Sequence, residues 1–391
     1  MARNIKLTPS ERFAKFMKVI ELFAKLVGAN IFDPNFRPNL LTAFIYVMFI
    51  FFYSFIIYTI YFGVVIEQDY TIIIQCLCIV TVAMQGTTKH LNALFNAKLF
   101  RFISSQLLTV YEEYECKNQH YIGHLNNTLV LVKRTIYFLF QINFILTMSG
   151  FAVPLFYFVV RNESIDIIPL MVPAVDRNTA FGITVYRLFH ATCIIFSAFG
   201  NYAYDGLVIL CILHIPLMKN ILKLKFDELD EMLELYPGNR KKTEPLLRDI
   251  FQWHQRYILI TEAIQTLFFW VIFVQIFTAT LSIIATIVCL FLGVWPVAPV
   301  FLVYSFMILY FYCGLGNLVE ISNDDLTYII YDCKWYELTP SEQKMILIML
   351  RVSQNPPAMT IGDMMPLSMN TALQLTKSIY TVAMLLHESV Q

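Results

Sequence analysis

The chain has 391 residues, a formal net charge of zero and a strongly apolar composition. Hydrophobic residues make up 58% of it and charged residues only 14%, whereas soluble proteins carry about 25% charged residues. The mean hydropathy is +0.62. This composition excludes an ordinary soluble domain, and the neutral charge gives no sign of a nucleic-acid partner. We therefore expect a membrane protein.

Apolar residues are concentrated in long stretches, each with the 18 or more residues that a helix needs to cross about 30 Å of hydrocarbon. Only Gly293-Val294-Trp295-Pro296 separates the fifth stretch from the sixth. The pattern predicts an all-α membrane protein with seven transmembrane helices. The expected spans are Leu40–Phe62, Tyr70–Thr88, Ile136–Val160, Val185–Leu213, Ile264–Leu292, Val294–Leu315 and Ser368–His387.

The distribution of lysine and arginine predicts the orientation, because basic residues stay on the cytoplasmic side. Most of the 28 basic residues lie in the N-terminal arm, in the loops after spans two and four, and before span seven. Lys89 is counted among them, directly after span two. The opposite loops hold only Arg161, Arg177 and Arg187. We therefore expect a cytoplasmic N-terminus and an extracellular C-terminus, which is the reverse of a G-protein-coupled receptor.

The outer loop between spans three and four carries Asn162-Glu163-Ser164, an acceptor sequence for N-glycosylation, so Asn162 is a candidate site. Asn126-Asn127-Thr128 also matches, but it lies on the cytoplasmic side and should stay unmodified. The eight cysteines are scattered and predict no disulfide framework. The sequence likewise predicts no metal site and no cofactor.

Several helices are expected to continue outside the bilayer as a cytoplasmic anchor layer. Thr8-Pro9-Ser10-Glu11 is a capping box that begins an amphipathic helix, and Thr339-Pro340-Ser341-Glu342 repeats it. Spans two, four, five and six should extend beyond the membrane, with a turn at Tyr236-Pro237-Gly238-Asn239. Their apolar stripes either contact other subunits or pack within one chain. The expected divisions are an N-terminal arm (1–39), spans one to six (40–319), an anchor segment (320–367), and a pore helix with its tail (368–391).

No hydrolase, kinase or metalloenzyme motif occurs, so we do not expect an enzyme. Asp205 in span four is either hydrogen-bonded between helices or part of an ion path, because ionisable groups within spans are costly. Span seven carries a polar face that predicts either a pore lining or a stripe buried within one bundle. The residues of this face are Gln374, Ser378, Thr381, Leu385 and Glu388.

The last part of the chain, Glu320 to Gln391, closely resembles the C-terminal signature of insect odorant receptors. The order is Tyr328, Trp335, a short helix, Asn355-Pro356, Thr360-x-Gly362, Leu367-Ser368 and Leu375-x-Lys377-Ser378-x-Tyr380. The chain departs from the family pattern at Glu342-Gln343-Lys344, where a basic pair is common, and at Ile379-Tyr380, where Tyr-Ser is common.

The resemblance implies an odorant receptor subunit in the plasma membrane of olfactory sensory neurons. In that family four subunits surround one cation pore, lined by the second half of helix seven, which here carries Thr381, Leu385, Glu388 and Ser389. The loop between spans four and five is shorter than in the shared co-receptor. This length favours a ligand-tuning subunit that assembles with the co-receptor in a tetramer.

The family's pocket for a small volatile odorant lies in the outer half of the bundle, among spans two to six. The candidates here, chosen by depth, are Ile74, Cys78, Met148, Phe151, Phe189, Phe196, Phe301 and Tyr304. Each of them could instead be ordinary helix packing. Two other classes stay open: a gustatory-receptor-like channel, although its Thr-Tyr-x-x-x-x-Gln-Phe motif is absent, and a G-protein-coupled receptor.

Overall fold

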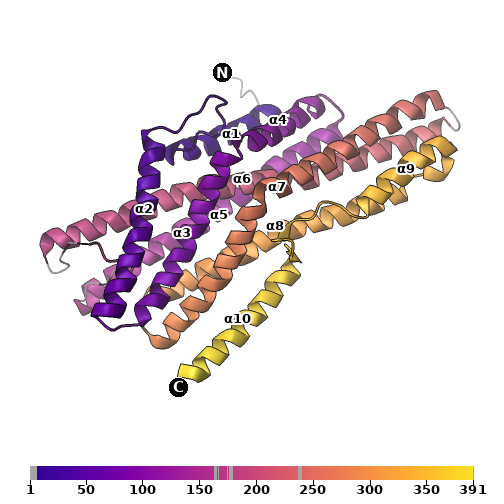
Figure 1. The fold of residues 1–391 in the computed structure, drawn as a ribbon. Coiled ribbons are helices and arrows are strands. Elements are labelled where there is room, and N and C mark those ends of the chain that lie inside the picture. Colours follow the sequence, from indigo (N-terminus) through magenta and orange to yellow (C-terminus); the bar gives the residue numbers. More distant parts are fainter. Residues whose placement is uncertain are drawn as a thin grey trace.

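The computed structural model describes residues 7–162, 165, 167–173, 175, 179–236 and 240–390, without the side chains of 180, 240 and 387–390. The described part is almost entirely helical (Figure 1). Its α-helices are α1 Pro9–Leu26, α2 Leu40–Tyr61, α3 Thr71–Phe95, α4 Ala97–Tyr114, α5 Gln119–Arg161, α6 Ala180–Leu235, α7 Arg240–Leu292, α8 Ala298–Asp332, α9 Pro340–Ser353 and α10 Met369–Val390.

Short elements complete the chain. A π-helical turn, η1 Phe62–Ile66, extends α2, and a 3₁₀ turn, η2 Trp335–Glu337, precedes α9. The strands β1 Thr360–Ile361 and β2 Met365–Pro366 form an antiparallel hairpin that leads into α10. The expected turn at Pro237-Gly238-Asn239 lies outside the described residues.

The seven predicted spans all fall on helices, and the seven-helix architecture is confirmed. Within the described residues, six helices are long and apolar enough to cross a membrane: α2 with η1, α3, α5, α6, α7 and α8. The seventh, α10, has 22 residues. The break between spans five and six is also present, since α7 ends at Leu292 and Gly293 adopts a positive φ of 65° before α8 begins.

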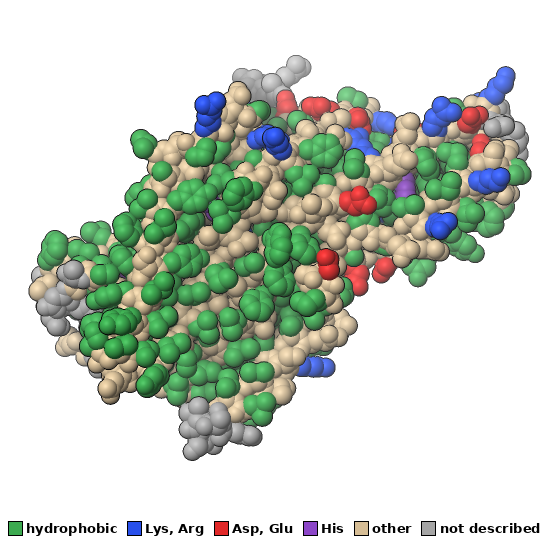
Figure 2. Space-filling model, in the orientation of Figure 1, with side chains coloured by type: hydrophobic (Ala, Val, Ile, Leu, Met, Phe, Trp, Pro, Cys, Tyr) green, Lys and Arg blue, Asp and Glu red, His purple; other side chains and the backbone are tan. Residues whose placement is uncertain are grey.

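The longest helices run well past the membrane. α6 has 56 residues and α7 has 53, each about 80 Å at 1.5 Å per residue, against about 30 Å of hydrocarbon. α5 also begins at Gln119, long before the predicted span, and that extension was not predicted. We call the helices outside the spans the anchor layer: α1, α4, α9 and residues 119–135, 214–235, 240–263 and 316–332. Figure 2 shows most charged side chains over this layer and apolar side chains over the spans.

Both predicted capping boxes are present. Thr8 Oγ1 accepts a hydrogen bond from the amide of Glu11, whose carboxylate accepts one from the amide of Thr8. In the second box the Glu342 carboxylate accepts from both the amide and the hydroxyl of Thr339, at 2.9 and 2.6 Å. α1 then packs along the bundle and buries Phe13, which stacks on Tyr111 of α4 at 4.8 Å between ring centroids. The N-terminal arm is therefore a packed part of the anchor layer.

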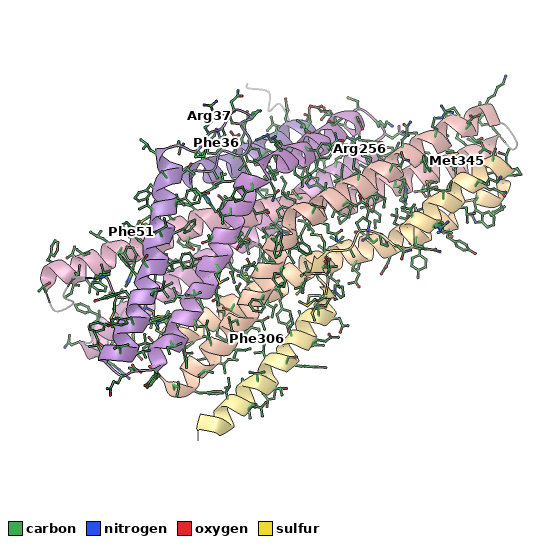
Figure 3. All side chains as sticks on the ribbon, viewed as in Figure 1. Phe36, Arg37, Phe51, Arg256, Phe306 and Met345 are labelled. Atoms are coloured by element: carbon green, nitrogen blue, oxygen red, sulfur yellow. The ribbon has the colours of Figure 1, made fainter. Side chains whose placement is uncertain are left out.

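α6 is the central helix, and α5 and α10 lie at the periphery. In the most apolar stretch of α6, 72% of the residues are buried, whereas none is buried in that of α5. Arg256 of α7, labelled in Figure 3, donates to Glu113 of α4 at 2.8 Å and joins these helices in the anchor layer. Phe51 on α2 is 49% exposed on the outer surface of the spans. α10 packs against α7 and α8 and diverges from the other helices (Figure 1).

Candidate functional site

A cavity of about 390 Å³ lies between α2, α3, α5, α6 and α8. Aromatic and aliphatic side chains form most of its wall, including Phe49 and Phe52 of α2. Glycines widen it: a Cβ added at Gly86 of α3 or Gly150 of α5 would meet no atom within 4 Å. Concave, mostly apolar cavities of this size are typical binding sites for small molecules.

Four of the predicted pocket residues line this cavity: Phe151 of α5, Phe196 of α6, and Phe301 and Tyr304 of α8. Trp295 and Val297, in the turn before α8, line the cavity next to Phe301. The ring of Phe301 packs against that of Trp295 with 5.3 Å between the centroids. The side of the cavity formed by α8 is therefore aromatic.

The other four predicted residues lie elsewhere in the structure. Ile74 and Cys78 pack in a small cluster beside Cys289, and Cys78 Sγ is 3.5 Å from Thr286 Oγ1. Met148 is 51% exposed, and the ring of Phe189 packs against Phe55 of α2. Each of these lies at the expected depth on a face of its helix that does not line the cavity.

A buried ion pair lies at the end of the cavity nearest the anchor layer. Lys89 Nζ of α3 is 2.6 Å from Asp205 Oδ1 of α6, and both side chains are at most 2% exposed. Tyr312 of α8 donates its hydroxyl to the same carboxylate oxygen at 2.5 Å. Asp205 therefore connects three helices, as the hydrogen-bonding interpretation expects. Its Oδ2 is buried without a partner in the described part of the chain.

The placement of Lys89 in a cytoplasmic loop was wrong, because α3 continues to Phe95 and buries it. The sequence does contain a sign of this ion pair. A lysine and an aspartate each lie in or next to a long apolar segment, and charges buried in membranes are usually paired. His90, which follows Lys89 in the sequence, also lines the cavity. The Nδ1 atom of His90 is 2.8 Å from the hydroxyl of Tyr204.

The polar face of α10 points away from the chain's own helices. Gln374, Ser378, Thr381 and Leu385 are all exposed, Leu385 by 62%. The opposite face buries Ile379 against the bundle. Glu388 lies on the last turns of α10, and its side chain is outside the described part. The stripe is thus not buried within a single chain, and it is free to face a pore or another subunit.

Asn162, the candidate glycosylation residue, ends α5 in the left-handed conformation with φ of 53° and is exposed. Glu163 and Ser164, which complete the acceptor sequence, lie outside the described residues. The observed exposure meets one requirement for modification.

Comparison with known proteins decides the family. Residues 69–380 match the family model described as the 7tm odorant receptor, which is well over half of the chain. This chain belongs to the odorant receptor family. The receptor is also 24% identical to putative odorant receptor 83c of Drosophila melanogaster over 399 residues, covering 97% of this chain and 98% of that one. The family is one of receptors rather than enzymes, and membrane-spanning helices place the chain in a membrane.

Solved structures show the same fold. The receptor is similar to the insect olfactory receptor OR5 from Machilis hrabei in complex with eugenol, with a TM-score of 0.80 and 15% identity, covering 98% of this chain and 100% of that one. The structure described without eugenol gives a TM-score of 0.76 with 15% identity, covering 96% and 98%. The likeness therefore extends over the whole architecture, anchor layer included.

Proposed function

We propose that this odorant receptor is a ligand-tuning subunit that binds a small volatile molecule in its helical cavity. Binding opens a non-selective cation channel that the subunit forms with the family's co-receptor in a tetramer. The single observation that carries the proposal is the cavity of about 390 Å³, which has a mostly apolar wall and lies within the spans. The olfactory receptor from Machilis hrabei, which shares the fold, has been solved with eugenol.

The route from the cavity to the pore runs along α8. Phe301 and Tyr304 of α8 line the cavity, and two turns later Tyr310 lies 3.0 Å from Thr376 of α10 through their hydroxyls. A ligand that binds more tightly when α8 is displaced shifts the population toward that arrangement and moves α10 with it. The exposed position of α10, which packs mainly against α7 and α8 among the helices described, supports such a movement.

The exposed face of α10 supports the pore assignment. An apolar residue at a constriction can close a pore by dewetting, and a ring of carboxylates favours cations. Leu385 and Glu388 would supply these two features, with Thr381 one turn deeper. The tetramer would stand in the plasma membrane of olfactory sensory neurons, with the anchor layer cytoplasmic, in contact with membrane lipid and permeated by cations.

The pore is tested by whole-cell current under a broad panel of volatiles, with this chain alone and with the co-receptor. We expect a cation current only when both are present, and G-protein blockade should not reduce it. Leu385→Ser and Thr381→Ala should change ion permeability or block. Leu373→Ser, also exposed on α10 but off the polar face, is the matched control. A current from this chain alone would indicate a homomer, and unchanged permeation in the first two variants would exclude the pore face.

The cavity is tested separately by filling it. Gly150→Leu places a side chain in space where an added Cβ meets no atom within 4 Å, so it should occupy the cavity without displacing the backbone. We expect odorant-evoked current to fall at least about tenfold while surface delivery stays normal. Gly123→Ala is the control, because its Cβ also meets nothing and it lies in the anchor layer. An unaltered response to Gly150→Leu would place the ligand elsewhere.

A further inference from the structure

The wall of the cavity is mostly apolar. Besides His90, Trp295 and the hydroxyls of its tyrosines, its polar side chains form one strip where α5 faces α6. Asn143 and Thr147 come from α5, and Ser197 and Asn201 come from α6. Within each helix the two residues are four positions apart, which puts both on one face. The two polar pairs therefore border the same space from two helices that pack against each other.

The α5 pair has unused hydrogen-bonding capacity. Neither Asn143 nor Thr147 has a side-chain hydrogen bond among the described residues, although both line the cavity. Two positions later on the same helix, Ser149 donates its hydroxyl to the carbonyl of Ile145 at 2.9 Å, as polar side chains in spans commonly do. Both side chains are half-buried, so their amide and hydroxyl remain available to hydrogen-bond a ligand in the cavity.

Among the described residues, the α6 pair is held only by long hydrogen bonds. Asn201 Nδ2 lies 3.4 Å from Ser197 Oγ, and its Oδ1 accepts from Lys89 Nζ at 3.5 Å. Distances near 2.9 Å are usual for such bonds. The Asn201 amide can therefore turn toward a ligand at little cost, because Lys89 keeps its closer partner, the carboxylate of Asp205.

We propose that these four side chains form a subsite for one hydroxyl or carbonyl oxygen, so that the receptor's ligand is a neutral alcohol, phenol, aldehyde or ketone on an apolar body. The inference rests on the proposed function and names its ligand class. No Asp, Glu, Lys or Arg belongs to the described lining, so no permanently charged side chain there neutralises a carboxylate or an amine. A pure hydrocarbon would leave the strip unpaired and bind more weakly.

The test measures binding to the purified full-length receptor in lipid nanodiscs. Trp295 lines the cavity, so its fluorescence reports occupancy, and Trp295→Phe identifies the part of the signal that comes from it. The probes are two series matched in number of heavy atoms: benzyl alcohol, benzaldehyde and ethylbenzene, and nonanol, nonanal and decane. Affinities are expressed against the concentration of each probe dissolved in the lipid, obtained from its measured partition coefficient, because alcohols, aldehydes and hydrocarbons partition differently. The affinity of one probe can then be compared directly between variants in the same lipid.

In the wild type, at least one series should show the oxygen-bearing members binding about tenfold more tightly than the hydrocarbon. Asn143→Leu with Thr147→Val should bring that ratio to about one without weakening the hydrocarbon. Ser149→Ala, on the same helix but already bonded to its own backbone, should keep the ratio. Thr147→Val alone and Ser197→Ala, both nearly isosteric, repeat the test should the double variant fail to fold.

Three results would overturn the subsite: equal affinities for hydrocarbon and oxygenated probes, a preference that survives the variants, or no Trp295-dependent response to any probe. The measurement needs no current, so it separates the two proposals. Oxygen-selective binding without an odorant-evoked current would refute the channel and leave the subsite. A current evoked equally by hydrocarbons would refute the subsite alone.

Discussion

The anchor layer and the spans differ in what lies between their helices. In the anchor layer, neighbouring helices are joined by paired side chains: Tyr257 donates to Asn323 at 2.7 Å, and His254 lies 2.8 Å from Ser353. In the spans, apolar helices surround a cavity, and the span part of α5 on its wall holds few buried residues.

The two regions should therefore differ in how easily their helices move. Segments with few buried contacts open at low free energy, whereas densely bonded segments open only with the whole fold. The anchor layer can therefore hold the helices in register while the spans change their spacing around a ligand. Two features stand at the boundary between the regions, namely the Lys89–Asp205 ion pair and the approach of α8 to the start of α10. Variants there should have the largest effects.

The ion pair should be the most sensitive point. Lys89→Met leaves the carboxylate of Asp205 buried without its cation, and breaking a buried pair costs about 3–5 kcal/mol. We expect little receptor at the cell surface, measured by surface biotinylation. Lys89→Met with Asp205→Leu removes both charges and should recover part of the delivery. Lys25→Met is the control, because its exposed pair with Glu21 is worth less than about 1 kcal/mol. Normal surface delivery of Lys89→Met alone would show that the ion pair is not needed for a stable receptor.

The second boundary feature is the contact of Gly316 with the chain that enters α10. A Cβ at Gly316 would lie 2.0 Å from the carbonyl oxygen of Leu367, so Gly316→Ala must displace the backbone before α10. The cost should reach or exceed the roughly 1–3 kcal/mol of an overpacked core. We expect odorant-evoked current to be lost. Gly314→Ala is the control on the same helix, since its Cβ would meet only Met369 Sδ at 3.9 Å.

Most of the fold could be predicted because hydrophobic length and capping chemistry are local. The capping boxes at Thr8 and Thr339 need only four residues each, and all seven spans are continuous runs. The extension of α5 to Gln119 escaped prediction because its amphipathic first half is stabilised by packing against distant helices, which no short window contains. The burial of Lys89 was not predicted because its partner, Asp205, lies more than a hundred positions away in the sequence.

The cavity could be predicted only in part, since depth along a helix does not fix rotation about its axis. Phe151 and Phe196 reach the wall, whereas Met148, three residues before Phe151, is exposed on another face of α5. The polar strip of the cavity is visible in the sequence as a pattern. Asn143 with Thr147, and Ser197 with Asn201, repeat at a spacing of four inside otherwise apolar segments.

The smallest expected effect is a change of stability with pH inside the anchor layer. It tests whether that layer and the cavity behave independently. Burial lowers the pKa of His254 to about 4, from 6.5, so the folded chain keeps the ring neutral where an unfolded chain would protonate it. Stability contributed by His254 is therefore complete above pH 6.5 and is lost as the pH falls toward 4, by about 1 kcal/mol for the first pH unit.

Hydrogen exchange of α9, corrected for intrinsic rates, should quicken over that interval. His254→Gln, which can keep the bond to Ser353, should reduce the dependence. Because the cavity lies in the other region, Trp295 fluorescence titrations should be the same in this variant and the wild type. A shift in ligand affinity on protonating His254, absent in His254→Gln, would show instead that anchor layer and cavity are coupled.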